Sequence, residues 1–500
     1  MRDRAVGNER SGPRYPLSWL AATLAIDRLW RTYGLPGSTH QDRPDSRCYE
    51  PETEPDCAKC HVRATVTVVH ECQRDVGLIR AVGPWALAAS VISVIVGAGI
   101  FAVPAALAAS VGPYAPLAFL ACGFAVGAVA ICFAEGGSRV PTSGGVYGLI
   151  EAAFGPLIGY IAGTLLWVGC VLACGGVSAA LADVVASLFR QSLIVPVRSI
   201  AIVGVVGGIA LVNIGGVARG ARLVGIAAPV KLVPLVIFIV VGASAIHASS
   251  FSQTVPPDVQ DLGRALILGV FAFVGMETSL CASGEVLQPS RTIPRALAIA
   301  LLSTTILYVG IQVVAQGILG PALATSRAPL ADAMAQIHPT LRALMLVGTA
   351  LSMFGYLGSD ILGSPRQLFA FARDGLLPRP LARLHRRSHA PHVAILSYAT
   401  LAIALALTGT FAELAVLSAL AIAALYIAGC AAAWVLARRG VAIAGTPLGF
   451  RFLGTSTVIG ISSMAALIAL GSRQEVTGLF TLIGLSAGVY LVQTRVALAR

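Results

Sequence analysis

The chain has 500 residues, of which 56% are hydrophobic and only 12% carry a charge, and its mean hydropathy is +0.82. These values exclude an ordinary water-soluble globular domain and indicate an all-α polytopic membrane protein. The formal net charge is +12, but beyond residue 80 most of the arginines fall in alternate loops between apolar segments, so we interpret them as the positive-inside pattern and expect no nucleic-acid partner.

The first 80 residues differ from the rest of the chain. They are rich in arginine, proline and acidic side chains, and they contain no apolar run long enough to span a membrane. No signal peptide is visible in them. We therefore expect residues 1–80 to form a polar, largely disordered cytoplasmic extension.

This extension contains a cysteine and histidine cluster. Cys57-Ala-Lys-Cys60-His61 has the spacing of a c-type haem attachment site, but haem attachment would require export of the segment. Zinc is a chemically reasonable alternative, with ligands drawn from Cys57, Cys60, His61, His70 and Cys72. The simplest interpretation is an extension without a cofactor. A membrane redox or metal-sensing protein stays open as a function of another class.

From residue 84 onward the chain contains apolar segments near the length of about 20 residues that crosses the hydrocarbon core. We expect twelve membrane spans, at residues 85–109, 115–134, 148–188, 200–215, 223–246, 262–284, 296–319, 341–364, 393–408, 414–436, 452–470 and 477–492. A polar, glycine-rich loop is expected at residues 135–147, between the second and third spans. Residues 81–440 would form the transport core with ten spans, and residues 441–500 would supply the last two.

The arginines predict the orientation of these spans. With the N-terminus placed inside the cell, 16 arginines beyond residue 80 fall in inner loops or at the C-terminus and 6 fall in outer loops. An excess of basic residues on the cytoplasmic side is the expected bias. Both termini are therefore predicted to lie in the cytoplasm, with the protein in the cell (inner) membrane.

Two of the expected spans are interrupted. In the first, Gly97 and Gly99 lie within the apolar run, and glycine lets the backbone leave helical geometry and lets a ligand approach it. Close helix packing is the alternative explanation for these glycines. In the sixth, Gly275 precedes Glu277 at mid-membrane depth, where a carboxylate is costly and indicates a function. Interrupted spans in corresponding positions are typical of transporters built from inverted repeats, with the substrate near the bilayer midplane.

Several motifs together resemble the amino acid-polyamine-organocation superfamily, of the bacterial amino acid permease type, from residue 82 to the C-terminus. The motifs are Gly97-Ala-Gly99-Ile-Phe101, Phe133-Ala-Glu135, Gly145-Val-Tyr147, Ala153-Phe-Gly155-Pro156, Gly163-Thr-Leu-Leu-Trp167, Phe273-Val-Gly-Met-Glu277, Gly284-Glu285, Pro289-Ser-Arg291 and Ala372-Arg373-Asp374-Gly375. The resemblance implies about twelve helices and a LeuT-like core of five plus five inverted repeats, with helices 1 and 6 discontinuous.

The resemblance also implies a substrate site made largely of backbone. The amide N–H groups of Gly97, Ala98 and Gly99 are expected to be free at the start of a half-helix, where the helix dipole favours a carboxylate. Many relatives have serine at the position of Ala98, so here carboxylate binding would depend on amides alone.

The ammonium group of the substrate would donate to carbonyl groups freed at the two breaks, those of Ile95, Phe271 and Val274. Phe271 also matches an aromatic residue that, in relatives, closes over the substrate from outside, although ordinary helix packing is an alternative. Glu277 resembles an acid linked in the family to gating or proton movement. Its alternative is a structural role, bonding the backbone freed at the break.

Two further ionisable residues lie inside spans. Lys231 is the only lysine after residue 80, and a lysine at this position in relatives holds together the first and eighth spans, where sodium sits in sodium-coupled relatives. This implies sodium independence and a role in coupling, with Lys231 as a fixed internal cation or a proton-sensitive group. Snorkelling to the inner face is the alternative. Asp360 falls where some relatives contact the distal part of the substrate, but pairing with Lys231 or capping a helix break would also explain it.

The sequence thus predicts a secondary active transporter for amino acids, as a proton-coupled symporter or an exchanger, with no enzymatic activity and no cofactor. A polyamine or organic-cation permease is the alternative within transport, favoured if Asp360 faces the site. The partners expected are a small-molecule amino acid or amine and the lipid bilayer, with a homo-oligomer also compatible.

Overall fold

The computed structural model describes residues 82–97, 99–140, 145–186, 188–189, 193–216, 231–252, 256–277, 286–373, 375–442 and 447–498. All of them belong to one compact unit, residues 62–500. The cluster at Cys57, Cys60 and His61 therefore lies outside the described residues, and so does Ala98.

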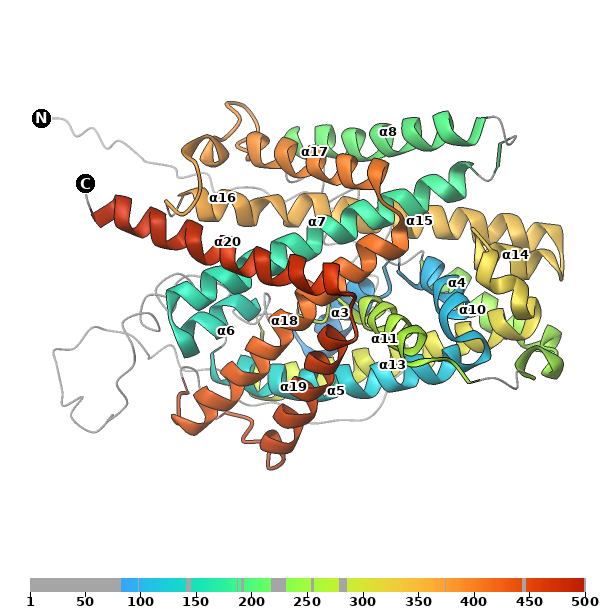
Figure 1. The fold of residues 1–500 in the computed structure, drawn as a ribbon, viewed down its shortest axis with the longest axis horizontal. Coiled ribbons are helices and arrows are strands. Elements are labelled where there is room, and N and C mark those ends of the chain that lie inside the picture. Colours follow the sequence, from blue (N-terminus) through green and yellow to red (C-terminus); the bar gives the residue numbers. More distant parts are fainter. Residues whose placement is uncertain are drawn as a thin grey trace, which may run out of the picture. The chain divides into compact units, whose positions relative to one another are not determined.

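The described residues are almost entirely helical (Figure 1). The α-helices are α3 (Pro84–Ile95), α4 (Gly99–Val111), α5 (Ala115–Arg139), α6 (Gly145–Phe154), α7 (Pro156–Ala186), α8 (Ile194–Ile214), α10 (Leu232–Gly242), α11 (Val259–Phe273), α13 (Pro289–Leu319), α14 (Pro329–Ala335), α15 (Pro339–Gly363), α16 (Pro365–Arg373), α17 (His392–Thr408), α18 (Phe411–Arg438), α19 (Leu453–Ala469) and α20 (Arg473–Leu498). Short 3₁₀ turns are η2 (Gly112–Tyr114), η4 (Ala243–Ala245), η5 (Ala248–Phe251), η7 (Gly320–Thr325) and η8 (Arg379–Ala382).

Within the described ranges, seven helical segments are long and apolar enough to cross a membrane. Five shorter apolar helices, at residues 84–95, 145–154, 232–245, 392–408 and 453–469, lie among them. The all-α, polytopic membrane class predicted from the sequence is therefore confirmed. The number of twelve spans and the inverted repeat stay predictions.

The core is formed where long helices pack along one another. Helix α18 packs against α7, α5 and α19, and α13 packs against α5 and α3. Helix α11 contacts α4, α5 and α18, so the two segments expected to be interrupted lie next to each other although they are far apart in the sequence. Apolar side chains fill these interfaces, as the high proportion of hydrophobic residues in the segments predicts.

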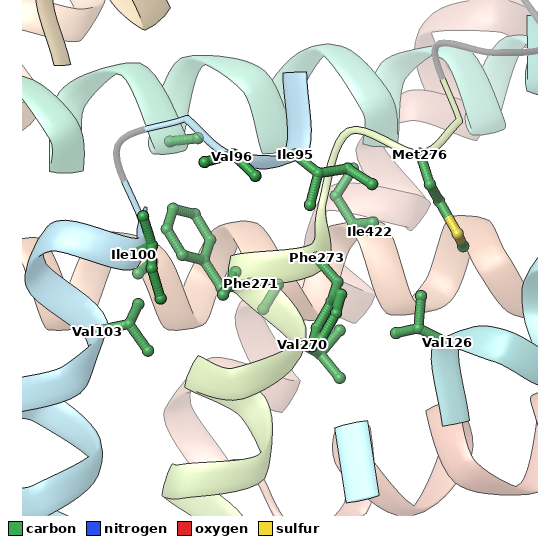
Figure 2. Packing of buried hydrophobic residues seen from close by; sticks show 14 of the residues in the cluster. Ile95, Val96, Ile100, Val103, Val126, Val270, Phe271, Phe273, Met276 and Ile422 are labelled. Carbon is green, nitrogen blue, oxygen red and sulfur yellow. The ribbon is translucent and has the colours of Figure 1, made fainter. Parts of the chain in front are cut away.

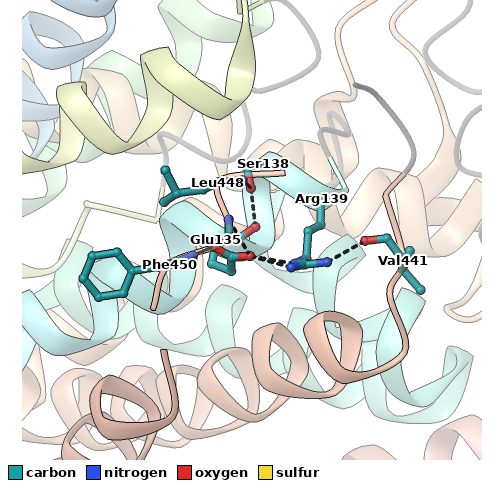
Figure 3. A network of polar contacts seen from close by, with 7 residues as sticks. Glu135, Ser138, Arg139, Val441, Leu448 and Phe450 are labelled. Carbon is teal, nitrogen blue, oxygen red and sulfur yellow. Dashed lines mark hydrogen bonds and ion pairs between the residues drawn. The ribbon is translucent and has the colours of Figure 1, made fainter. Parts of the chain in front are cut away.

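The expected loop at residues 135–147 is partly wrong, because α5 continues to Arg139. Its last turn is stabilised by a polar network (Figure 3). The Glu135 carboxylate, fully buried, accepts from Arg139 Nε at 2.7 Å and from the Phe450 amide at 3.0 Å. Arg139 Nη1 donates to the Val441 carbonyl at 3.1 Å. Glu135 and Arg139, which suggested a loop, instead form an ion pair within the helix. Both also bind the segment between α18 and α19.

The third span was expected to be continuous and is broken instead. Helix α6 ends at Phe154 and α7 begins at Pro156. Between them Gly155 has φ +88°, a conformation that glycine adopts readily and other residues do not. Proline then suits the first position of the next helix, because its missing N–H would have no helical partner there. The Ala153 carbonyl left free by the break accepts from Arg439 Nη1 at 2.9 Å.

Candidate functional site

The first span is interrupted where the sequence predicted it. Helix α3 ends at Ile95 and α4 begins at Gly99, and Val96 leaves helical geometry with φ −74° and ψ 63°. The Gly97 N–H donates to the Ile95 carbonyl at 2.7 Å, which closes a three-residue turn. From α15, Ser352 Oγ donates to the Gly97 carbonyl at 3.0 Å. The break is therefore a fixed structure, supported by a third helix.

Helix α11 ends at a facing break. Its last residue is Phe273, and a turn over residues 274–277 follows. Gly275 has φ +118°, and a Cβ there would lie 2.7 Å from Val94 Cγ1 of α3. Any larger residue would clash, so a glycine is required. The second half of the expected sixth span, residues 278–285, lies outside the described residues. Figure 2 shows the two interrupted segments side by side, lined by Ile95, Val96, Ile100, Phe271 and Phe273.

Tyr308 of α13 joins the two breaks. Its hydroxyl lies 2.8 Å from the carbonyl oxygen of Ile95 and 3.1 Å from that of Ala272, and its single proton is shared between them. The side chain is fully buried. The sequence interpretation missed this residue. A tyrosine in the middle of an apolar span was the available signal, because a buried hydroxyl needs a hydrogen-bond partner.

Three backbone groups that were expected to be free have partners in this conformation. The Gly97 N–H bonds to the Ile95 carbonyl, which also accepts from Tyr308, and the Phe271 carbonyl accepts from the Val274 N–H at 3.2 Å. That expectation is therefore wrong in detail, because an apolar interior forces freed backbone groups to pair within the protein. Substrate binding by these residues, and by Gly99, stays a prediction.

The Phe271 side chain crosses from α11 to two other helices. A methyl group at Gly99 of α4 would lie 3.6 Å from Phe271 Cε1, and the ring stands edge-to-face with Phe411 of α18 at a centroid distance of 5.7 Å. Only 6% of the residue is exposed. Phe271 thus covers the start of α4, where the substrate carboxylate was expected.

Glu277 is buried and holds the turn after α11. Its Oε2 accepts from the Gly275 N–H at 3.0 Å and from the Tyr426 hydroxyl of α18 at 2.7 Å. These bonds correspond to the structural alternative, in which the acid pairs with backbone freed at the break. Because Tyr426 of α18 supplies one of these bonds, a substitution of Glu277 would perturb both the end of α11 and α18. Its gating role stays a prediction.

Lys231 precedes α10 and is 7% exposed. Its Nζ donates to the Ser93 carbonyl of α3, so it binds the first half of the interrupted span. The predicted link to the eighth span is made by another residue, Ser352 of α15, which bonds to Gly97. Among the described residues no carboxylate pairs with Lys231, and the pairing with Asp360 that the sequence left open is not found.

Asp360 lies near the end of α15 and is half-buried. Oδ1 accepts from Ser364 Oγ at 2.8 Å, and Oδ2 accepts from the Tyr398 hydroxyl of α17. Tyr398 in turn packs edge-to-face against Trp167 of α7, with centroids 6.1 Å apart. Ser364 separates α15 from α16, so one of the bonds supports the helix break that was an alternative for Asp360. The sequence did not identify Tyr398.

Comparison with known proteins agrees with this geometry. The model of the family described as amino acid permease matches residues 82–486, a range that excludes Cys57, Cys60 and His61. The branched-chain amino acid permease BcaP of Bacillus subtilis is 26% identical over 447 residues, which cover 84% of this chain and 94% of the relative. An uncharacterized transporter of Mycobacterium tuberculosis is 34% identical over 352 residues, covering 68% of this chain and 74% of the relative.

A second uncharacterized M. tuberculosis transporter is 30% identical over 363 residues, covering 65% of this chain and 73% of the relative. The family match spans both interrupted segments, α3 with α4 and the end of α11. The resemblance seen in the sequence is thereby confirmed. The chain belongs to the amino acid permease family of the amino acid-polyamine-organocation superfamily.

Proposed function

We propose that this permease carries amino acids across the cytoplasmic membrane by alternating access, as a proton-coupled symporter or an exchanger, independently of sodium and with both termini inside the cell. The observation that carries the proposal is the meeting of the α3–α4 break with the end of α11. Discontinuous helices that face each other supply backbone donors and acceptors for the charged groups of an amino acid.

We further propose a substrate with an apolar side chain. The residues at the two breaks are Ile95, Val96, Ile100 and Phe271, which offer apolar surface and no charge to a side chain bound there (Figure 2). The relative named branched-chain amino acid permease supports the same choice. Asp360 would favour a cationic substrate instead, but both of its carboxylate oxygens already accept hydrogen bonds from protein hydroxyls.

Sodium independence is supported by Lys231. Its ammonium group lies against the Ser93 carbonyl of α3, close to the helix break. A fixed positive charge repels a second cation, so the protein would use Lys231 where sodium-coupled relatives use the ion. Coupling to protons or to a counter-substrate then supplies the driving force.

Uptake by reconstituted proteoliposomes tests these points together. We expect labelled leucine, isoleucine and valine to enter faster than arginine, lysine or putrescine, to respond to an imposed proton gradient or to internal amino acid, and to ignore sodium. Asp360→Asn should retain leucine uptake, and Asp258→Asn is the matched control because asparagine still caps α11. Cys57→Ala with Cys60→Ala should leave uptake unchanged.

Preferential uptake of putrescine or arginine, lost about tenfold or more in Asp360→Asn as expected for one charge-assisted contact, would instead establish a cationic substrate. Failure of any amino acid or amine to enter would overturn the proposal. A strict sodium requirement would overturn only the part that concerns Lys231.

A further inference from the structure

The segment between α16 and α17 forms a basic cavity that is open to the surface. Its volume is about 580 Å³, and it is lined by Arg383, Leu384, His385, Arg386, Arg387 and His392. Five of these six side chains are cationic or can become cationic. The cavity is distinct from the two helix breaks, which are formed by α3, α4 and α11.

Among the described residues, no acid forms an ion pair with the arginines of this cavity. Residues 375–392 contain four arginines, three histidines and no aspartate or glutamate. In the part of the chain that the structure describes, the ion pairs formed by arginine involve Arg139, Arg198 and Arg264, all elsewhere. The positive-inside bias explains why arginines are present in such a loop. It does not explain why three of them line one cavity with no ion pair to a described acid.

The two histidines offer further donors. His385 Nδ1 accepts from the Ser388 backbone N–H at 3.4 Å and lies 3.0 Å from Ser388 Oγ. Because Nδ1 accepts, the neutral ring carries its proton on Nε2, which is then a donor. The His392 ring stands edge-to-face with His385 at 5.8 Å, and its buried Nδ1 has no partner among the described residues. A buried nitrogen without a partner is costly, and a ligand oxygen would remove that cost.

The backbone adds to the positive electrostatic potential of the cavity. His392 is the first residue of α17, a helix of 17 residues, so the positive end of its dipole lies at the cavity. The loop before it is closed by its own hydrogen bonds, His385 N–H to Ala390 O at 2.8 Å and His389 N–H to His385 O at 3.0 Å. His389 has φ +52°, a left-handed conformation that reverses the chain. The loop backbone that carries the arginines and histidines is therefore held in place before any ligand arrives.

We propose that this cavity binds a phosphate group, carried either by the headgroup of an anionic phospholipid or by a free phosphate ion. Arginine forks match pairs of phosphate oxygens, and a phosphate has enough oxygens to use several arginines, the histidines and the start of α17 together. A carboxylate has only two oxygens and would leave most of these donors unpaired. The volume exceeds that of a phosphate ion, so a headgroup also fits.

The first test titrates inorganic phosphate into the purified full-length chain in detergent, with chloride at equal ionic strength as the reference for screening. The thermal midpoint should rise with phosphate. Arg386→Gln, at an exposed lining residue, should weaken the apparent affinity about tenfold, the effect of one charge-assisted contact. Arg379→Gln is the matched control, because Arg379 is an exposed arginine of the same loop that does not line the cavity.

The second test distinguishes the two sources. Native mass spectrometry of the same protein, mixed with equal amounts of phosphatidylglycerol and phosphatidylcholine, should show preferential retention of phosphatidylglycerol, reduced in Arg386→Gln and kept in Arg379→Gln. A response to phosphate alone assigns a free ion, and a response to phosphatidylglycerol alone assigns the lipid. No response to either probe, or an equal loss in Arg379→Gln, would overturn the proposal. Neither result depends on which substrate is transported.

Discussion

At the scale of single residues, Tyr308 has the clearest measurable role. Tyr308→Phe removes the hydroxyl that serves both the Ile95 and Ala272 carbonyls and leaves them with one partner fewer in a buried site. We expect a loss of stability of about 1–3 kcal/mol, the usual cost of an unsatisfied buried polar group. Transport should slow as well, because the two breaks lose their common support. Thermal unfolding and leucine uptake of the reconstituted variant measure these effects.

Tyr114→Phe is the control for that experiment, since Tyr114 lies in η2, is half-buried and forms no side-chain hydrogen bond with the described residues. Equal effects in the two variants would show that loss of any tyrosine hydroxyl perturbs the protein. That result would remove the special role of Tyr308.

The sequence could identify ionisable residues but not their partners. Glu277 and Lys231 were visible because a charge in an apolar span is costly and therefore needs a reason. Their partners are the Gly275 amide and Tyr426 for the acid, and the Ser93 carbonyl for the amine. The sequence cannot show which backbone group or tyrosine each will meet, since hydrogen bonds between residues far apart in the chain depend on how helices pack.

At the scale of elements, the end of α5 acts as a clamp on the segment between α18 and α19. Glu135→Gln would leave Arg139 buried without its counter-charge, which typically costs about 3–5 kcal/mol. We expect a clear fall of the thermal midpoint and faster proteolysis between α18 and α19. Glu475→Gln is the comparison, because the Arg264–Glu475 pair is partly exposed and such pairs are worth at most about 1 kcal/mol. Similar falls in both variants would contradict the clamp.

Hydropathy predicted most helices well and failed at two kinds of place. The spans expected for α15, α17, α18 and α19 agree with the helices within three residues at each end, whereas those for α8 and α13 were expected to begin six and seven residues too late. Charged residues at the end of α5 were interpreted as a loop because their burial with the Phe450 amide cannot be deduced from composition. Gly155 was recognised within a motif, yet its left-handed conformation, which divides α6 from α7, requires knowledge of the neighbouring α18.

At the scale of the whole molecule, the orientation in the membrane is a prediction with a direct test. Single cysteines replacing the exposed Arg327 and Arg386 should lie on opposite faces, with Arg327→Cys outside. In intact cells a membrane-impermeant maleimide should label Arg327→Cys, and it should reach Arg386→Cys only after permeabilisation. Peptide mass spectrometry separates these sites from native cysteines, and the described ones are buried or half-buried. The reverse pattern would invert the proposed topology.

The family and the two helix breaks followed from sequence motifs, because glycines inside an apolar span mark a place where the backbone can leave the helix. The sequence did not show which helices are neighbours in the bundle, because any apolar helix can pack against any other and only side-chain shape decides between them. The basic cavity between α16 and α17 was visible only as a dense run of arginines. Its shape depends on the reversal of the chain at His389 and on the start of α17.

Lys231 has a practical consequence that follows from its rarity. The chain contains two lysines, Lys59 and Lys231, so an amine-reactive reagent can modify few positions. Lys231 is buried against α3, and its amine can react only when that contact opens. The rate of its acylation, measured on the corresponding peptide, would report how often the contact between Lys231 and α3 opens during transport. Lys231 can thus serve as a native chemical reporter of the conformational cycle, without the introduction of a label.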